Sequence, residues 1–177
     1  MKTYIVLLKG INVGGHKKVP MAELRELLSK SGFKNIKTYI QSGNIILQTL
    51  EDCTLKIEET IKKTILNHFG FEVSVLVKTP QQLSYIFNNS PFSEAEKKAS
   101  YFIMLHDIPN SDLVKMTSQK VYKDETYQII NNCIYYFSET GFGKAKFNVA
   151  YFERNLKTFA TVRNYNTMLK LVSLSEE

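Results

Sequence analysis

The chain has no tryptophan and little cysteine, histidine or proline, with two, three and four residues of each. Cys53 and Cys133 are far apart and belong to no C-x-x-C pair, which argues against a disulfide framework or a zinc site. We expect both to be thiols that are packed in the fold or have no chemical role. The histidines are scattered, and no two have the spacing of metal ligands. Neither a metal nor a cofactor is therefore expected.

Long hydrophobic runs are missing as well. No apolar run approaches the roughly 20 residues that span a bilayer, and the N-terminus leads into an alternating strand without a cleavage pattern. With 44% apolar residues among 177, the chain can form one compact unit or two small half-domains. These absences predict a cytoplasmic protein with no membrane partner.

The known phosphate-binding motifs are incomplete. Gly10 and Gly15 have the spacing of the two P-loop glycines, but His16 and Lys17 follow where Lys and Ser or Thr are required. The G-x-G-x-x-G pattern of dinucleotide sites is absent. No Ser, His and acid set can be assembled from the spacing. The sequence names no catalytic residue, and whether the protein is an enzyme stays open.

Positive charge is what the chain has in surplus. Its formal net charge is +6 and its pI is near 9.2, which favours polyanions, phosphorylated ligands or acidic partners. Part of the surplus is structural, because Glu58 with Lys62 and Glu59 with Lys63 have the spacing of solvated helix pairs. The basic residues better placed to meet a ligand lie near the glycines and near the C-terminus: Lys9, Lys17, Lys18, Lys144, Lys146, Arg154, Lys157 and Arg163.

The hydrophobic periodicity of residues 1–79 predicts a βαββαβ unit. The first strand is apolar on both alternating faces, which is typical of a central strand covered on both sides. Ser42-Gly43 reads as a tight hairpin turn. This order is that of the ferredoxin-like fold, an antiparallel sheet with helices on one face. The expected elements are strand 2–9, a helix from Pro20 to Gly32, strands 36–41 and 44–49, a helix ending at Gly70, and strand 73–77.

A second, similar pattern follows a helix and polar linker at residues 80–98. Within 99–177 we expect a strand at 101–106, a short helix at 110–118, a hairpin over Asn131-Asn132, and two C-terminal helices. The fold class is therefore α+β, with two ferredoxin-like half-domains. The second half is expected to be incomplete, lacking its final strand and gaining a C-terminal helix.

The predicted sheet brings two polar segments together. Its first and third strands are neighbours, so the loop at 10–15 should lie beside the hairpin at 41–44. Side-chain amides of Asn12, Gln41 and Asn44 would then share a rim with exposed backbone N–H groups, and such a rim can hold an anion. The alternative is structural, because glycines between elements usually serve the turn itself.

An RNA-recognition module has the same element order and stacks bases on aromatic residues of its central strands. Strand 44–48 has no aromatic residue, which disfavours base stacking there but leaves phosphate contacts by lysines. Tyrosines of the second half can stack bases, or can fill a core or an interface instead. These are Tyr101, Tyr127, Tyr135 and Tyr136.

Four sequence blocks together resemble the bacterial family known as domain of unknown function 1697. They are Leu-Leu-Lys-Gly-Ile-Asn-Val-Gly-Gly at 7–15, Val-Pro-Met-Ala-Glu-Leu at 19–24, Thr-Tyr-Ile-Gln-Ser-Gly-Asn at 38–44, and Thr-Val-Arg-Asn-Tyr-Asn-Thr at 161–167. The resemblance covers nearly the whole chain. It implies a cytosolic protein with two ferredoxin-like halves and no established activity.

The resemblance also adds the C-terminal block to the candidate site. Asn164 can cap the last helix, with Asn166 and Thr167 in its first turn, whereas Arg163 has no obvious role in the fold. The chain departs from the family pattern at Tyr165, where tryptophan is usual. It departs again before Lys146, where Ala145 replaces the serine of a Ser-Lys pair, so a hydroxyl role is in doubt there.

Three functional hypotheses follow. The first is a binding module for a phosphate-bearing ligand, a nucleotide or nucleic acid. The second is an enzyme acting on a phosphorylated or amide-containing small molecule, with Arg163 as a clamp and His16 as the nearby titratable group. The third is a homo-oligomeric assembly protein without a small ligand. The candidate ligand-binding residues are Gly10, Asn12, Gly14, Gly15, Lys17, Gln41, Ser42, Asn44, Lys144, Lys146, Arg163, Asn164 and Asn166.

Overall fold

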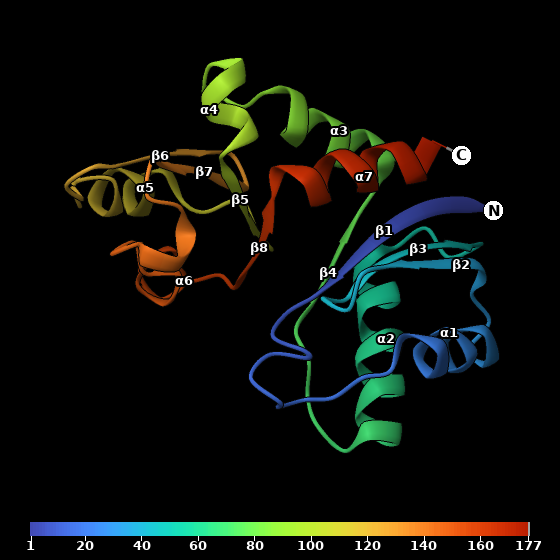
Figure 1. The fold of residues 1–177 in the computed structure, drawn as a ribbon. Helices are drawn as coiled ribbons and strands as arrows, with labels where there is room; N and C mark the ends of the chain where they lie inside the picture. Colours follow the sequence, from blue (N-terminus) through green and yellow to red (C-terminus); the bar gives the residue numbers. More distant parts are fainter. Residues whose placement is uncertain (177) are drawn as a thin grey trace. The chain divides into compact units, whose positions relative to one another are not determined.

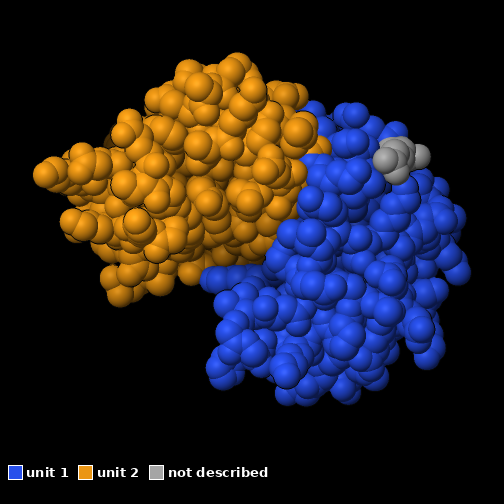
Figure 2. Space-filling view, in the orientation of Figure 1, with its two compact units in different colours: residues 1–85, 170–177 blue, residues 86–169 orange. Residues whose placement is uncertain are grey.

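The computed structural model describes residues 1–176 and divides into two compact units, coloured separately in Figure 2. The first unit contains Met1–Tyr85 and the residues from Lys170 on, and the second contains Ile86–Leu169. Each unit has one four-stranded antiparallel sheet. The α+β class is thus confirmed. Within 1–176, no helix combines the length and the apolar character needed to cross a membrane.

Helices and strands of the first unit follow the order that hydrophobic periodicity predicts. The helix after the glycine loop begins at Met21 rather than Pro20, because Pro20 keeps an extended backbone and occupies the position just before the helix. The elements are β1 (Lys2–Leu8), α1 (Met21–Lys30), β2 (Lys34–Tyr39), β3 (Asn44–Thr49), α2 (Thr54–Phe69) and β4 (Val75–Lys78), followed by the start of α3 (Pro80–Asn88).

The first sheet has the strand order β2-β3-β1-β4. β1 is central because both of its faces are apolar, and its residues from Tyr4 to Leu8 are buried. One face packs on α1 and α2 (Figure 1), where Val6 of β1 shares a core with Leu24 and Ile61. This packing fixes α2 beside the end of β1, where the candidate site begins.

The hairpin between β2 and β3 is longer than the two-residue turn expected from Ser42-Gly43. Tyr39 pairs with Asn44, so four residues form the loop. Ile40 and Gly43 have φ of +50° and +75°. The prediction was wrong because Ile40 adopts a left-handed conformation that β-branched residues rarely take, and sequence alone gave no reason to expect it.

The second unit has the strand order β6-β7-β5-β8, and β8 corrects the expectation of an incomplete half. β8 pairs antiparallel with β5 along its whole length. It was missed because it is short and alternates polar residues, Thr161 and Arg163, that are buried in this fold. The elements are α4 (Glu94–Lys98), β5 (Tyr101–Leu105), α5 (Ser111–Thr117), β6 (Glu125–Ile130), β7 (Cys133–Ser138), the 3-10 helix η1 (Phe142–Lys144), α6 (Val149–Leu156), β8 (Ala160–Asn164) and α7 (Tyr165–Glu176).

Aromatic rings fill the core between the second sheet and α6. Phe147 stacks on Phe152 with ring centroids 4.4 Å apart, and Tyr127 meets Phe152 edge to face at 4.9 Å. Burial is the main cause that raises the pKa of Tyr127 and of Tyr136 to about 12.

The β6–β7 hairpin turns over Asn131-Asn132 as expected, with Asn131 at φ +51°.

Gly43 should be far less tolerant of substitution than Gly15, although both have positive φ. A Cβ at Gly43 would lie 2.6 Å from Leu8 Cβ, whereas a Cβ at Gly15 meets nothing within 4 Å. Gly15→Ala should cost about 1–2 kcal/mol for the left-handed backbone. Gly43→Ala should cost about 1–3 kcal/mol more for overpacking. Urea unfolding measures both, and equal losses would contradict the packing assigned to Gly43.

The raised pKa values of Tyr127 and Tyr136 predict a loss of stability at high pH. A folded pKa of about 12 lies above the unfolded value of about 10, so the folded state holds these protons more tightly. Their contribution is complete below about pH 10 and is lost as the pH rises through about 12. A phenolate absorbance titration should show Tyr127 and Tyr136 ionising after the exposed tyrosines. Ionisation of all ten tyrosines in one step near pH 10 in the folded protein would refute this.

Candidate functional site

The loop between β1 and α1 is a small closed turn. The amide of His16 donates to the carbonyl of Val13 at 3.0 Å, and the amide of Asn12 donates to the carbonyl of Lys17 at 3.1 Å. Gly14 and Gly15 occupy the centre of the turn with φ of +57° and +79°. Both residues therefore serve the turn, since glycine takes positive φ without steric cost.

Asn12 holds this loop against two neighbouring segments. Its Nδ2 donates to the carbonyls of Val19 at 3.0 Å and Gln41 at 2.8 Å, and its Oδ1 accepts from the amide of Val19 at 2.8 Å. Its φ of +54° is one that asparagine tolerates better than most residues. The loop and hairpin thus lie side by side, as the strand order predicts. The carboxamide expected to meet a ligand instead joins these two segments.

The hairpin amide at Asn44 is also engaged within the fold. Asn44 is fully buried, and its Nδ2 donates to the carbonyl of Tyr39 at 3.1 Å and to Ser42 Oγ at 2.9 Å. The side chain of Gln41 is exposed, and its backbone carbonyl accepts from Asn12. Two of the three amides predicted for the rim therefore stabilise the loop and the hairpin.

A cleft of about 600 Å³ opens beside the glycine loop, against α2 and the segment that precedes β4. It contains two of the predicted residues, Gly10 and Lys17. A Cβ at Gly10 would meet nothing within 4 Å, so the backbone is open to approach at this point. The lining residues are Lys9, Gly10, Lys17, Lys62, Lys63, Leu66, Glu72, Val73 and Ser74.

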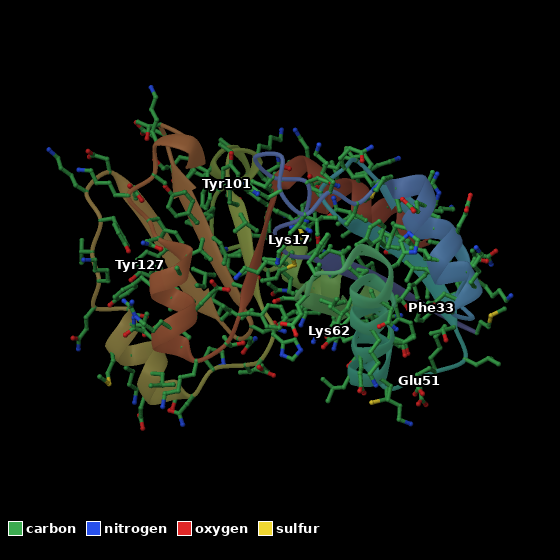
Figure 3. The ribbon with its side chains drawn as sticks, turned by 90° about the horizontal axis from the view of Figure 1, so that it is seen from below. Lys17, Phe33, Glu51, Lys62, Tyr101 and Tyr127 are labelled. Atoms are coloured by element: carbon green, nitrogen blue, oxygen red, sulfur yellow. The ribbon has the colours of Figure 1, made fainter. Side chains whose placement is uncertain are left out.

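Four lysine side chains line this cleft, and several are held by local partners. Lys17 Nζ donates to the backbone carbonyl of Glu72 at 2.7 Å and lies 5.8 Å from the centroid of the Phe71 ring. Figure 3 labels Lys17 on the loop and Lys62 on α2. An ammonium group has three donors, so one such contact leaves others for a ligand.

The ion pairs predicted on α2 are present, but Glu58 is buried rather than solvated, and the same lysines line the cleft. Lys63 Nζ lies 2.6 Å from Glu59 Oε1 and lowers the pKa of that carboxyl. Lys62 Nζ lies 3.9 Å from Glu58 Oε2, while Glu58 Oε1 accepts from the amide of Val77 at 3.1 Å. Sequence reasoning assigned Lys62 and Lys63 to solvent alone. The missed signal was their position late in a helix that packs beside the glycine loop.

Residues of the C-terminal block have clear roles within the second unit. Arg163 is buried in the sheet, and its Nη1 donates to Thr161 Oγ1 and to the carbonyl of Val162, both at 2.8 Å. Burial lowers its pKa to about 10, so the guanidinium stays charged at neutral pH. Asn164 Oδ1 accepts from the amide of Thr167 at 2.9 Å, which confirms the predicted helix cap. Asn166 is exposed in the first turn of α7.

The other candidates of the second unit divide between surface and core. Lys144 is exposed at the end of η1, and Lys146 lines a separate cavity of this unit. Tyr135 and Tyr136 are buried, and Tyr135 donates its hydroxyl to the carbonyl of Ile86 at 2.9 Å. These two tyrosines fill the core. Convergence of the C-terminal block with the glycine loop on one site stays a prediction.

Two of the three histidines, His68 and His106, lie beside carboxylates. His68 Nε2 lies 2.6 Å from Glu23 Oε1, and His106 Nδ1 lies 2.9 Å from Asp107 Oδ2. His16 is exposed on the glycine loop. Among residues 1–176, no group of three or more His, Cys, Asp or Glu side chains has an arrangement that could hold a metal ion.

The fold and the cleft define an α+β protein of two units with a lysine-lined hollow beside a glycine loop. Residues 1–135 match the family described as a protein of unknown function (DUF1697), and the chain belongs to this family. A similar solved structure is that of conserved bacterial protein SP0830 from Streptococcus pneumoniae. It is 26% identical with a TM-score of 0.74, and the match covers 100% of this chain and 99% of that one. A search of curated proteins finds no match.

Substitutions at Asn12 separate its side chain from its backbone conformation. Asn12→Gly keeps the positive φ but removes three hydrogen bonds, and should cost about 1–3 kcal/mol. Asn12→Ala should cost about 1 kcal/mol more, because alanine disfavours the left-handed region. Urea unfolding measures both. Unchanged stability in Asn12→Gly would show that the carboxamide does not hold the loop.

Proposed function

We propose that the protein binds a phosphate-bearing small ligand, such as a nucleotide, in the lysine-lined cleft of the first unit. The observation that carries the proposal is the meeting of Lys9, Lys17, Lys62 and Lys63 around one hollow of about 600 Å³. This volume is in the range of small-molecule sites. The open backbone at Gly10 lets a phosphate approach closely.

The charge balance of the cleft supports an anionic ligand. Among its lining residues, Glu72 is the one acidic residue within the described chain, against four lysines. Glu58 and Glu59 form ion pairs with Lys62 and Lys63 and reduce the net positive charge at the cleft. The exposed Lys63–Glu59 pair contributes little energy, so a phosphate can compete for the Lys63 ammonium group. Glu58 is buried, and Lys62 Nζ lies at the longer distance of 3.9 Å from its Oε2. Lysine suits this role because its ammonium group acts as a compact, mobile charge.

We also infer that each unit is a ferredoxin-like half-domain. Both have the order βαββαβ, and in both the strand that comes third in sequence lies between the first and second in the sheet. α1 and α2 pack on one face of the first sheet, and α5 and α6 pack on one face of the second. In the first unit, this order brings the glycine loop, α2 and the start of β4 to one end of the sheet.

Removing charge from the cleft should weaken binding selectively. In Lys17→Gln/Lys63→Gln, the dissociation constant for pyrophosphate and for nucleoside phosphates should rise at least about tenfold, because charge-assisted contacts are lost. Both residues are exposed and contact exposed partners, so the fold should survive. Isothermal titration at low and at physiological salt measures the change, and binding should weaken with salt as the charges are screened.

The matched control is Lys2→Gln/Lys30→Gln, which removes the same charge from exposed positions of the same unit outside the cleft. It should leave the dissociation constant within about twofold, since distant exposed charges are screened. Equal weakening in both double variants would reduce the effect to net charge. No binding of any phosphate compound by the unmodified protein would end the proposal.

A further inference from the structure

The second unit has a cavity of its own that sequence reasoning did not identify. It measures about 530 Å³ and lies between the segment that leads into β6 and the first turns of α6. Of its residues, Lys146 was among the predicted ligand-binding residues, and Arg154 was among the basic residues expected to be well placed to meet a ligand. Its lining consists of Lys120, Val121, Tyr122, Lys123, Lys146, Asn148, Ala150, Tyr151 and Arg154.

The lining is basic. It contains three lysines and Arg154, and none of its described residues is acidic. Glu125 of β6 is a carboxylate that contacts the lining, and both of its oxygens accept hydrogen bonds. Oε1 accepts from the amide of Lys146 at 2.6 Å, and Oε2 accepts from the amide of Phe147 at 2.9 Å and the hydroxyl of Tyr136 at 3.1 Å. The cavity therefore presents an excess of positive charge to a ligand.

Two tyrosine rings give the cavity an aromatic wall. Lys120 Nζ lies 5.7 Å from the ring centroid of Tyr122 and 5.9 Å from that of Tyr151. Tyr122 packs against Phe147 at 5.7 Å and Tyr151 against Phe152 at 5.3 Å, so the core holds both rings in place. A lysine ammonium over the tyrosine rings marks ring faces that attract cations and can stack planar groups.

The start of α6 completes the arrangement. Asn148 caps the helix by accepting from the amide of Tyr151, and Asn148, Ala150 and Tyr151 all line the cavity. The first amides of a helix and its dipole favour a bound anion. Cations, a helix start and aromatic rings thus converge on one hollow within a single unit.

We propose that this cavity binds a nucleotide unit, with its base against Tyr151 and Tyr122 and its phosphate on Lys123, Lys146 and Arg154. Phosphate alone would use the cations and leave the rings idle, whereas a nucleotide uses both. A second cavity of about 410 Å³ shares Lys120, Val121 and Tyr122 with this one. The shared lining gives room for a neighbouring nucleotide of a single strand.

The proposal is tested with the full chain and three probes: adenosine monophosphate, pyrophosphate and a short single-stranded oligoadenylate. All titrations use Lys17→Gln/Lys63→Gln as the background, in which binding to the first-unit cleft is expected to be at least about tenfold weaker. Binding is followed by titration calorimetry and by tyrosine fluorescence, since the chain has no tryptophan. The nucleotide should bind at least about fivefold more tightly than pyrophosphate and quench the tyrosines, because its base stacks.

Two further variants separate the base from the phosphate. Tyr151→Leu should weaken the nucleotide at least about fivefold and leave pyrophosphate unchanged. Lys123→Gln/Arg154→Gln should weaken all three probes, whereas the control Lys98→Gln/Lys115→Gln, at exposed positions of the same unit, should weaken none. Tighter binding of the oligoadenylate than of the mononucleotide would identify a strand as the source, and the reverse would identify a free nucleotide.

Two outcomes overturn the proposal. One is equal affinity for pyrophosphate and nucleotide with no effect of Tyr151→Leu, which would make the cavity a plain anion site. The other is no binding of any probe to a background variant that still unfolds cooperatively. Because the background lacks two of the cleft lysines, neither outcome bears on ligand binding by the unmodified first unit.

Discussion

The constraint on which the first unit depends is the carboxamide of Asn12. It joins the glycine loop to Val19 just before α1 and to Gln41 in the hairpin, which is 29 residues further along the chain. Since Lys17 lies in the same loop, this bonding also sets where its ammonium group reaches the carbonyl of Glu72. A residue expected to contact a ligand instead positions the residues that line the cleft.

In both units, buried charged groups are bonded within the fold, whereas basic side chains line the cleft and the cavity. The buried Glu58 is engaged by a backbone amide, and Arg163 is held by its own strand. Charges needed for the fold are thus bonded internally, as burial requires. In the first cleft, Lys63 makes an exposed, weak pair and Lys17 a backbone contact, and the 530 Å³ cavity of the second unit has no acidic residue in its described lining. Part of the net positive charge of +6 is therefore available to ligands at the first-unit cleft and at the 530 Å³ cavity of the second unit.

Much of the fold could be predicted, because hydrophobic periodicity reports which face is buried. β1, α1 and α2 have strong periods, and their existence and order were correct. Two features were predicted wrongly. β8 contains polar residues that are buried, so its sequence pattern resembles that of a loop. The β2–β3 turn depends on the left-handed backbone conformation of Ile40. Both features are decided by tertiary bonding, which a single sequence does not display.

The candidate site was predictable in its location and less so in its residues. Strand order placed the glycine loop beside the hairpin, and the family resemblance pointed to the same positions. Neither could show that Asn12 and Asn44 are engaged within the fold. Lys62 and Lys63 read as solvated helix pairs because spacing along a helix does not reveal a neighbouring loop. The aromatic cavity was missed because its residues come from a connecting segment and a helix start.

The most direct test of ligand binding in the first unit is nuclear magnetic resonance of the isotope-labelled full chain during titration with pyrophosphate. Gly10, Lys17 and Ser74 line the cleft. We predict that their amide signals shift together and saturate at a common dissociation constant. Shifts that never saturate, or that scatter over lysines outside the cleft, would contradict a specific site there.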